Sequence, residues 1–226
     1  MEWLKAEIEF ASAFSYRMPD TSSQFAIPCL LPGPSTVKLG LVATAILHSR
    51  KIGEGERIFE LVKQADVCFL TPEKIAVFNP LIKRLKAKKE GSGFEPTYGT
   101  RGYVIYLSPL ILYLGIPQAS KENLHEIFRT LRNLRRLGTS DSLLSVLNVA
   151  YETPEESPWL VRILESFTET PNGGLIQKVK DISPKATFEQ VNIYGKPKKE
   201  ALIEKFYVVP VKTIKEGGNW TLYSRI

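Results

Sequence analysis

Ser35, Thr36 and Lys38 lie at the expected start of a helix, where together they could bind an anion. Three prolines between residues 28 and 34 restrict the loop before them, because each fixes its own φ and pushes the preceding residue toward extended geometry. If Ser35 is the N-cap, Lys38 takes the third helical position, where Glu or Gln is favoured and the helix dipole disfavours a cation. A phosphate bound to the hydroxyls, the free N–H groups and the ammonium would remove this conflict. The alternative is that Lys38 simply points into solvent.

Basic residues are concentrated in the middle of the chain. The net charge is +6, but the segment from Lys74 to Arg136 holds twelve Lys and Arg against four acids, so it carries +8 and the remainder carries −2. Such a block in an otherwise balanced chain is typical of a protein that binds a polyanion, and nucleic acid is the leading partner. The alternative is a solvated surface without a partner.

Residues with catalytic chemistry are sparse. The two histidines, His48 and His125, belong to no metal motif, and Gly33 is not followed by the GK[ST] of a nucleotide-binding loop. Metal-independent RNA cleavage by Tyr16, Lys38 and His125 remains an alternative, since general acid–base catalysis needs only reach and a suitable pKa. Cys29 and Cys68 lie in apolar segments, and we expect both to be buried, reduced thiols. The sequence therefore predicts no metal and no cofactor.

The candidate functional residues must be positioned by a fold, and the pattern of hydrophobic residues predicts a fold of class α+β. Alternation from Trp3 to Phe14 indicates a half-buried strand, and a helix from Thr36 to His48 follows. Further elements are expected in chain order: a helix at 56–64, a strand at 66–70, an inserted segment at about 71–101, two strands or one bent hairpin within 102–115, a helix at 121–137 capped by Ser120, and a strand at 142–151. This order is the split βαβ, ferredoxin-like arrangement of many RNA-binding domains.

Residues 152–226 are expected to form a small β-rich C-terminal subdomain after this first domain of residues 1–151. Strands are predicted at 187–194, 206–214 and 219–226, with a turn at Asn172-Gly173-Gly174 and a hairpin turn at 216–218. No apolar run reaches membrane-spanning length, and the N-terminal residues lack the pattern of a secretory signal. A soluble, cytoplasmic protein is expected.

Four motifs carry a family resemblance: ASAFSYR, then PGPSTVKLG, then TYGTRGY, then RRLGTSDSLLSV. In this order they resemble the Cas five family of CRISPR-associated RAMP proteins, over roughly residues 1–151. The form of PGPSTVKLG and the Lys/Glu-rich composition look most like the type I-A branch. The resemblance implies a ferredoxin-like (RRM/RAMP) fold with an inserted, basic, thumb-like segment.

The resemblance also implies where the guide RNA would bind. Phosphate contacts are expected at the end of the first strand, at the helix start, in the thumb and in the loop after the second helix, with tyrosines beside splayed bases. The implied RNA-binding residues are Tyr16, Arg17, Ser35, Thr36, Lys38, Lys83, Arg84, Lys86, Arg101, Tyr103, Arg135, Arg136 and Gly138. Tyr98 is a second candidate for stacking.

The function implied is that of a non-catalytic subunit of a type I Cascade complex in antiviral defence. It would hold the 5′ handle of the crRNA, cap the backbone filament and contact the backbone subunit, the large subunit and target DNA near the PAM. One branch of the family, type I-C, cleaves repeat RNA with a Tyr, Lys and His set, but this sequence lacks a Lys-His pair at the expected place. The alternatives are a metal-independent endoribonuclease and a generic RRM-like RNA-binding module.

Overall fold

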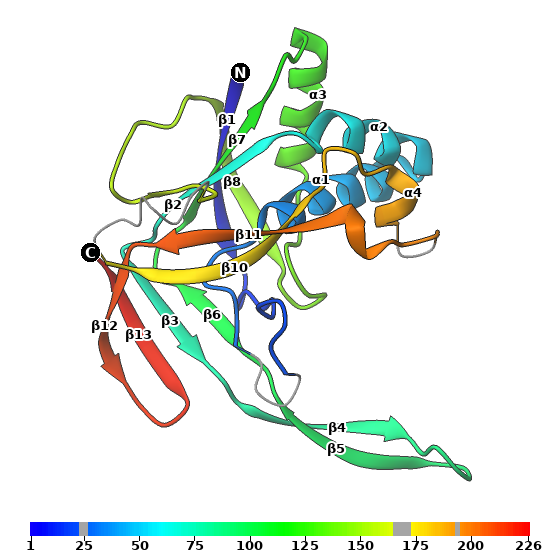
Figure 1. Cartoon of the computed structure of the whole chain (residues 1–226), viewed down its shortest axis with the longest axis vertical. Coiled ribbons are helices and arrows are strands. Elements are labelled where there is room, and N and C mark those ends of the chain that lie inside the picture. Colours follow the sequence, from blue (N-terminus) through cyan, green and yellow to red (C-terminus); the bar gives the residue numbers. More distant parts are fainter. Residues whose placement is uncertain (23–26, 165–172, 193–194) are drawn as a thin grey trace.

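The computed structural model describes residues 1–22, 27–164, 173–192 and 195–226. The chain is a mixed helix-and-sheet protein in which strands predominate, as the α+β prediction requires (Figure 1). Within the described residues, no helix is long and apolar enough to cross a membrane. Cys29 and Cys68 are buried free thiols, which confirms that prediction.

A five-stranded antiparallel sheet forms the centre of the molecule, in the order β8-β1-β7-β2-β9. Its strands are β8 (Leu144–Tyr151), β1 (Glu2–Phe10), β7 (Leu110–Ile116), β2 (Asp66–Leu70) and β9 (Leu160–Val161). The alternation in β1 works as predicted, because Leu4, Ala6 and Ile8 are completely buried. The strand ends earlier than expected, at Phe10, and Phe14 instead bridges to Val104 of another sheet.

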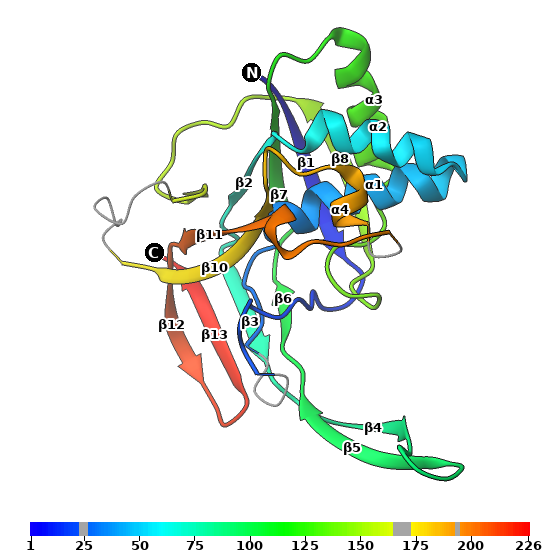
Figure 2. The same ribbon diagram turned by 45° about the vertical axis from the view of Figure 1, so that its right-hand side comes forward.

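Three longer helices lie together beside this sheet: α1 (Pro34–Ser49), α2 (Ile52–Val62) and α3 (Lys121–Arg132) (Figure 2). Helix α1 packs against α2 and β2, and α3 packs against β1 and β8. The N-cap of α1 is Gly33 and not Ser35, because Pro34 already has helical geometry at the first position. Ser120 does cap α3, with its hydroxyl accepting from the Asn123 N–H at 3.2 Å.

Helix α3 ends at Arg132, five residues before the predicted end. The Arg135 carbonyl then accepts a backbone hydrogen bond from the Leu144 N–H, and Arg136 bridges to Leu143. The segment after α3 therefore runs beside the start of β8 instead of continuing as a helix. Residues 133–138 are thereby brought against the sheet.

The inserted segment is a long hairpin of β4 (Leu81–Ala87) and β5 (Phe94–Thr100), which stands away from the body (Figures 1 and 2). Its base continues into β3 (Lys74–Phe78) and β6 (Tyr103–Tyr106). The predicted extended insertion is thus two paired strands whose side chains are mostly exposed.

The C-terminal region is β-rich, as predicted, but its strands differ from those expected. Strands β10 (Leu175–Ile182) and β11 (Leu202–Val209) form one pair, and β12 (Val211–Glu216) and β13 (Trp220–Arg225) form a hairpin that joins β3 and β6 in a four-stranded sheet. Pro210 interrupts the strand predicted at 206–214 because it cannot donate to the ladder. Residues 188–191 form the short helix α4 (Phe188–Val191), not a strand, and a 3₁₀ turn follows at Lys199–Ala201.

Two of the sequence predictions fall partly outside the described residues. These are Asn172 of the predicted turn and residues 193–194 of the strand predicted at 187–194. The division of the chain at residue 151 stays a prediction, although β13 is hydrogen-bonded to β3 across it.

Candidate nucleic-acid interface

A cleft of about 580 Å³, here called the hairpin cleft, lies between the base of the β4–β5 hairpin and the loop that follows α3. Arg17, Arg84 and Arg101 line it together with neutral residues, and no acid of the described chain does. Arg17 and Arg84 form no salt bridge within the described part of the chain, so their charges are free to meet an anion. The structure thus brings together three arginines that the sequence predicted as RNA contacts.

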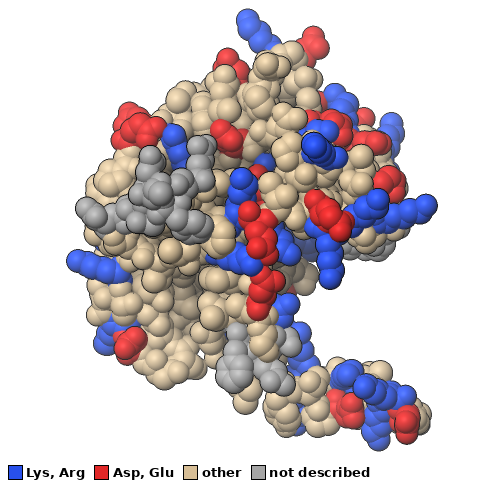
Figure 3. All heavy atoms as spheres, viewed as in Figure 1, with Lys and Arg blue, Asp and Glu red and all other residues tan. Residues whose placement is uncertain are grey.

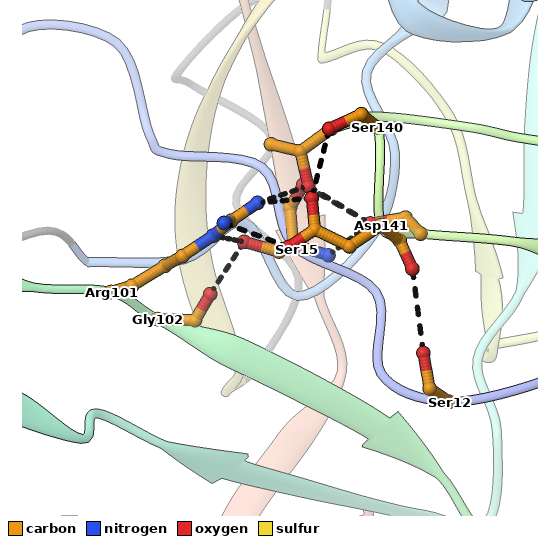
Figure 4. Close-up of polar contacts among 8 residues, drawn as sticks. Ser12, Ser15, Arg101, Gly102, Ser140 and Asp141 are labelled. Carbon is orange, nitrogen blue, oxygen red and sulfur yellow. Dashed lines mark hydrogen bonds and ion pairs between the residues drawn. The ribbon is translucent and has the colours of Figure 1, made fainter. Parts of the chain in front are cut away.

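Arg101 is not free, because a polar network already surrounds its guanidinium (Figure 4). Its Nη1 lies 2.8 Å from Asp141 Oδ2, its Nη2 donates to Asp141 Oδ1 at 2.9 Å and to Thr139 Oγ1 at 2.6 Å, and its Nε donates to Ser15 Oγ at 3.1 Å. Desolvation raises the pKa of Asp141, but the hydrogen bonds from Arg101 and Ser140 outweigh it and leave the pKa below its ordinary value. Arg101 therefore joins the base of the hairpin to the loop after α3, and its role as a phosphate contact stays a prediction.

Gly138 allows that loop to approach the chain at Ser15. Its φ is +86°, a conformation that favours glycine, and an added Cβ would lie 2.8 Å from the Ser15 carbonyl oxygen. The next residue, Thr139, donates its N–H to the same carbonyl at 3.0 Å, and Ser142 Oγ accepts from the Ser15 N–H at 2.9 Å. Gly138 thus allows the loop after α3 to adopt a positive φ and to pack closely against Ser15.

A second cleft of about 770 Å³, here called the helix cleft, lies between α1 and the segment that follows α3. As far as the structure describes the chain, no acid lines it. Six predicted RNA-binding residues line it: Tyr16, Ser35, Thr36, Arg135, Arg136 and Gly138. Arg135 and Arg136 form no salt bridge with any described residue. Burial raises the pKa of the Tyr16 phenol, so this side chain is a neutral hydrogen-bonding group in the cleft at physiological pH.

Lys38 does not belong to this cleft, which corrects the central expectation from the sequence. Its side chain is 1% exposed, and its Nζ lies 2.7 Å from Asp181 Oδ1 and donates to the Lys63 carbonyl at 3.1 Å. Burial lowers the pKa of the ammonium, and the Asp181 carboxylate opposes that effect. Lys38 neither points to solvent nor faces an anion site, because the carboxylate of β10 already neutralises it.

Strand β10 also holds the proline-containing loop. Gln177 Oε1 accepts from the N–H groups of Leu30 at 2.6 Å and Leu31 at 3.1 Å, and Gln177 Nε2 donates to the Leu31 carbonyl at 2.8 Å. Asp181 follows four residues later, on the same face of the strand. Neither residue was predicted from the sequence, because β10 has four polar and four apolar residues and its pattern does not single out Gln177 and Asp181.

The remaining predicted residues lie on or beside the hairpin. Lys83 lies opposite Tyr98 in the register, with its Nζ 5.9 Å from the ring centroid, on the other face of the hairpin from Arg84 and Lys86. Tyr103 is stacked on Phe78, with centroids 5.1 Å apart, and the Arg101 guanidinium lies 5.4 Å from its ring. Figure 3 shows Lys and Arg side chains gathered on the projecting hairpin.

The three residues of the cleavage alternative do not meet. Tyr16 lines the helix cleft and Lys38 is buried in its ion pair. His125 lines a neighbouring cavity of about 590 Å³, which shares His48 with the helix cleft but is lined by neither Tyr16 nor Lys38. Among the described residues, no group of three or more His, Cys, Asp or Glu side chains could hold a metal ion. The geometry therefore gives this trio no shared site.

Comparisons with known proteins give a full-length relative. A curated protein of Archaeoglobus fulgidus, "CRISPR-associated protein Cas5", is 40% identical over 231 aligned positions, which cover 98% of each chain. A solved CRISPR protein from Archaeoglobus fulgidus aligns with 100% of this chain and 92% of its own length, at 14% identity and a TM-score of 0.46. No family model matches the chain.

Proposed function

Because the chain belongs to the Cas5 family of CRISPR-associated proteins, we propose that it is a non-catalytic subunit of a type I Cascade complex that binds the 5′ handle of the crRNA. One observation supports RNA binding above the others. The hairpin cleft and the helix cleft are both free of acids, and between them they present Arg17, Arg84, Arg135 and Arg136 without intramolecular salt bridges among the described residues. Uncompensated arginines suit phosphate oxygens, which their guanidinium groups can contact with two parallel hydrogen bonds.

The fold proposal is a ferredoxin-like RAMP domain. Strands β8, β1, β7 and β2 are adjacent in that order and all antiparallel, with α1 between β1 and β2 and α3 between β7 and β8. This arrangement agrees with a split βαβ unit. The hairpin would then be the family's thumb, and the type I-A branch remains the assignment that the sequence motifs favour.

The two faces of the hairpin suggest two partners. The register places Leu81, Leu85, Phe94 and Tyr98 on one face together with Lys83, and the first four are 57–70% exposed. Arg84 lies on the other face and lines the hairpin cleft, whose lining Tyr98 also reaches at the edge of the first face. We therefore assign the guide RNA to the Arg84 face. The apolar face is assigned to a neighbouring Cascade protein, since exposed apolar clusters of this kind mark protein contacts. Contacts with the large subunit and with target DNA near the PAM belong to the same proposal.

The test is the RNA that co-purifies with a tagged complex from cells that carry the CRISPR locus. The wild-type protein is expected to retain RNA with repeat-derived 5′ ends, and Arg17→Gln/Arg84→Gln to lose most of it because two phosphate contacts are removed. Lys212→Gln/Lys215→Gln on β12 removes the same charge outside both clefts and is expected to behave as wild type. Random cellular RNA on the wild-type complex would exclude the proposal, and cleavage of repeat RNA by the isolated chain would exclude a non-catalytic role.

A further inference from the structure

A third basic surface lies between α3 and the edge strand β8. A cavity of about 630 Å³, here called the α3–β8 groove, is lined by Arg129, Arg132 and Arg135 on one side and by Leu147 and Asn148 on the other. Its described lining contains no acid. Because β8 is the outermost strand of the five-stranded sheet, this groove lies at the edge of the molecule's main sheet.

The charges in the groove have no compensation from the protein itself. Arg57, Arg101 and Arg162 each form a salt bridge with Asp or Glu. In the described part of the chain, the side chains of the three groove arginines form neither a salt bridge nor a hydrogen bond. Three like charges around one cavity repel one another, so an anion that enters the groove relieves this repulsion.

Aromatic rings adjoin the same groove. Phe128, which lines it, is stacked on Tyr151 of β8 with ring centroids 5.1 Å apart and an interplanar angle of 14°. His125 continues the row, parallel to Phe128 at a centroid distance of 6.4 Å. Tyr151 is 57% exposed, so part of its ring is open to a further planar group.

We propose that the α3–β8 groove binds single-stranded nucleic acid, with phosphates on Arg129 and Arg132 and an unpaired base on Tyr151. Arginines beside an exposed aromatic ring suit a single strand, because the bases of a duplex are already stacked on each other. Arg135 lines both this groove and the helix cleft, so a strand held in the cleft can continue around the end of α3. The proposal rests on the RNA-binding function proposed above, and a guide RNA or an unpaired target strand would present the same chemistry.

Fluorescence anisotropy of the purified full-length chain tests the phosphate contacts. The probes are fluorescein-labelled oligouridylate, oligodeoxythymidylate and duplex DNA, each about 20 residues long to exceed the site of a small domain. Arg129→Gln/Arg132→Gln is expected to bind the single strands more weakly and to reduce the slope of log K against log salt by about 1.4, or about 0.7 for each phosphate lost. Lys212→Gln/Lys215→Gln is the charge-matched control, and an equal slope in the two variants would overturn the proposal.

Tyr151 provides the second arm. Tyr151→Ala is expected to weaken single-strand binding about 5- to 150-fold through the loss of base stacking, whereas Tyr151→Phe keeps the ring and is expected to bind as wild type. Equal affinities for Tyr151→Ala and Tyr151→Phe would overturn the stacking contact. Preference for oligouridylate over oligodeoxythymidylate would assign the groove to guide RNA, and equal binding of both would extend the assignment to an unpaired DNA strand. Tighter binding to duplex DNA would overturn the single-strand assignment.

The same assay separates this inference from the function proposed above. If Arg17→Gln/Arg84→Gln loses affinity while Arg129→Gln/Arg132→Gln does not, the hairpin cleft binds RNA and the groove does not. The reverse result would support the groove and reject the hairpin cleft. If the groove variant binds all probes normally but fails to join its complex, the groove contacts a protein and the nucleic-acid inference is wrong.

Discussion

The ammonium of Lys38 lies 2.7 Å from the carboxylate of Asp181, and this pair joins the first turns of α1 to β10. Both side chains are withdrawn from solvent, Lys38 to 1% exposure and Asp181 to 13%. A buried charge without its partner is strongly destabilising. The pair therefore determines how the proline-containing loop and the start of α1 sit on the C-terminal strands.

Asp181→Ala is expected to lower the free energy of unfolding by about 3–5 kcal/mol, because it leaves the Lys38 ammonium buried and unpaired. From the sequence alone, Lys38→Glu is predicted to interact more favourably with the helix dipole. In the structure it places two carboxylates together, so it is expected to lower the free energy of unfolding as much as Asp181→Ala does. The double variant Lys38→Met/Asp181→Leu removes both charges and is expected to lose less stability than Asp181→Ala, although the Lys63 carbonyl and the Ile182 N–H lose their side-chain partners. Urea unfolding measures all three, and a double variant as unstable as Asp181→Ala would contradict this account.

Gln177→Ala is expected to cost about 3 kcal/mol or more, since it leaves the Leu30 and Leu31 N–H groups and the Leu31 carbonyl without their buried partner. Gln64→Ala, an exposed position just after α2, is the control and is expected to change stability very little. Thermal unfolding of the two variants gives the comparison. Similar midpoints would mean that the loop finds other hydrogen-bond partners.

Gly138→Ala is expected to destabilise the protein by about 2 kcal/mol or more, through both its positive φ and the contact of the new Cβ with the Ser15 carbonyl. Gly53→Ala in α2 meets no atom within 4 Å and is expected to stabilise the helix by about 0.5–1 kcal/mol. The two substitutions therefore shift the unfolding midpoint in opposite directions. A shift in the same direction would show that the loop after α3 can relax around the added methyl group.

The contact between Arg101 and Asp141 predicts a pH dependence. The pKa of Asp141 is lower in the folded chain than its ordinary value of 3.8, so its contribution to stability is present above that value and is lost as the pH falls through the folded pKa. As the pH falls from about 4 to the folded pKa, wild type is therefore expected to lose stability relative to Asp141→Asn. Near neutral pH the difference in free energy of unfolding between the two proteins is expected to be constant. Because Asp141 is exposed, the effect is small, and hydrogen exchange of residues 138–142 is the more sensitive measurement. Equal exchange in the two proteins at pH 7 would argue against the link.

Local signals in the sequence predicted much of the fold and part of the site. The alternation in β1 and the apolar runs of the two strands before α3 are periodic patterns in the residue order, and the Ser120 cap of α3 is a local contact, so the sequence reports all three directly. The end of α3 was wrong because its last predicted residues bond to Leu143 and Leu144, partners that no helical pattern contains. Strand β10 escaped prediction because two of its buried positions hold Gln177 and Asp181, polar residues whose partners lie far away along the chain.

The sequence by itself determined the family, the α+β class and the basic middle segment, since motifs, periodicity and charge are properties of residue order. Only the tertiary structure decided which cations are free. Lys38 was predicted to bind a phosphate because it lies near the start of a helix. In the structure its ammonium is instead paired with the carboxylate of Asp181, 143 residues away in the chain. In the same way, the Arg101 guanidinium is paired with the Asp141 carboxylate. Four arginines remain available to pair with an anion, because no acid of the described chain forms a salt bridge with them: Arg17, Arg84, Arg135 and Arg136. Whether a charge is compensated depends on which groups lie within a few ångströms of it in the folded chain, and the order of residues does not give those distances.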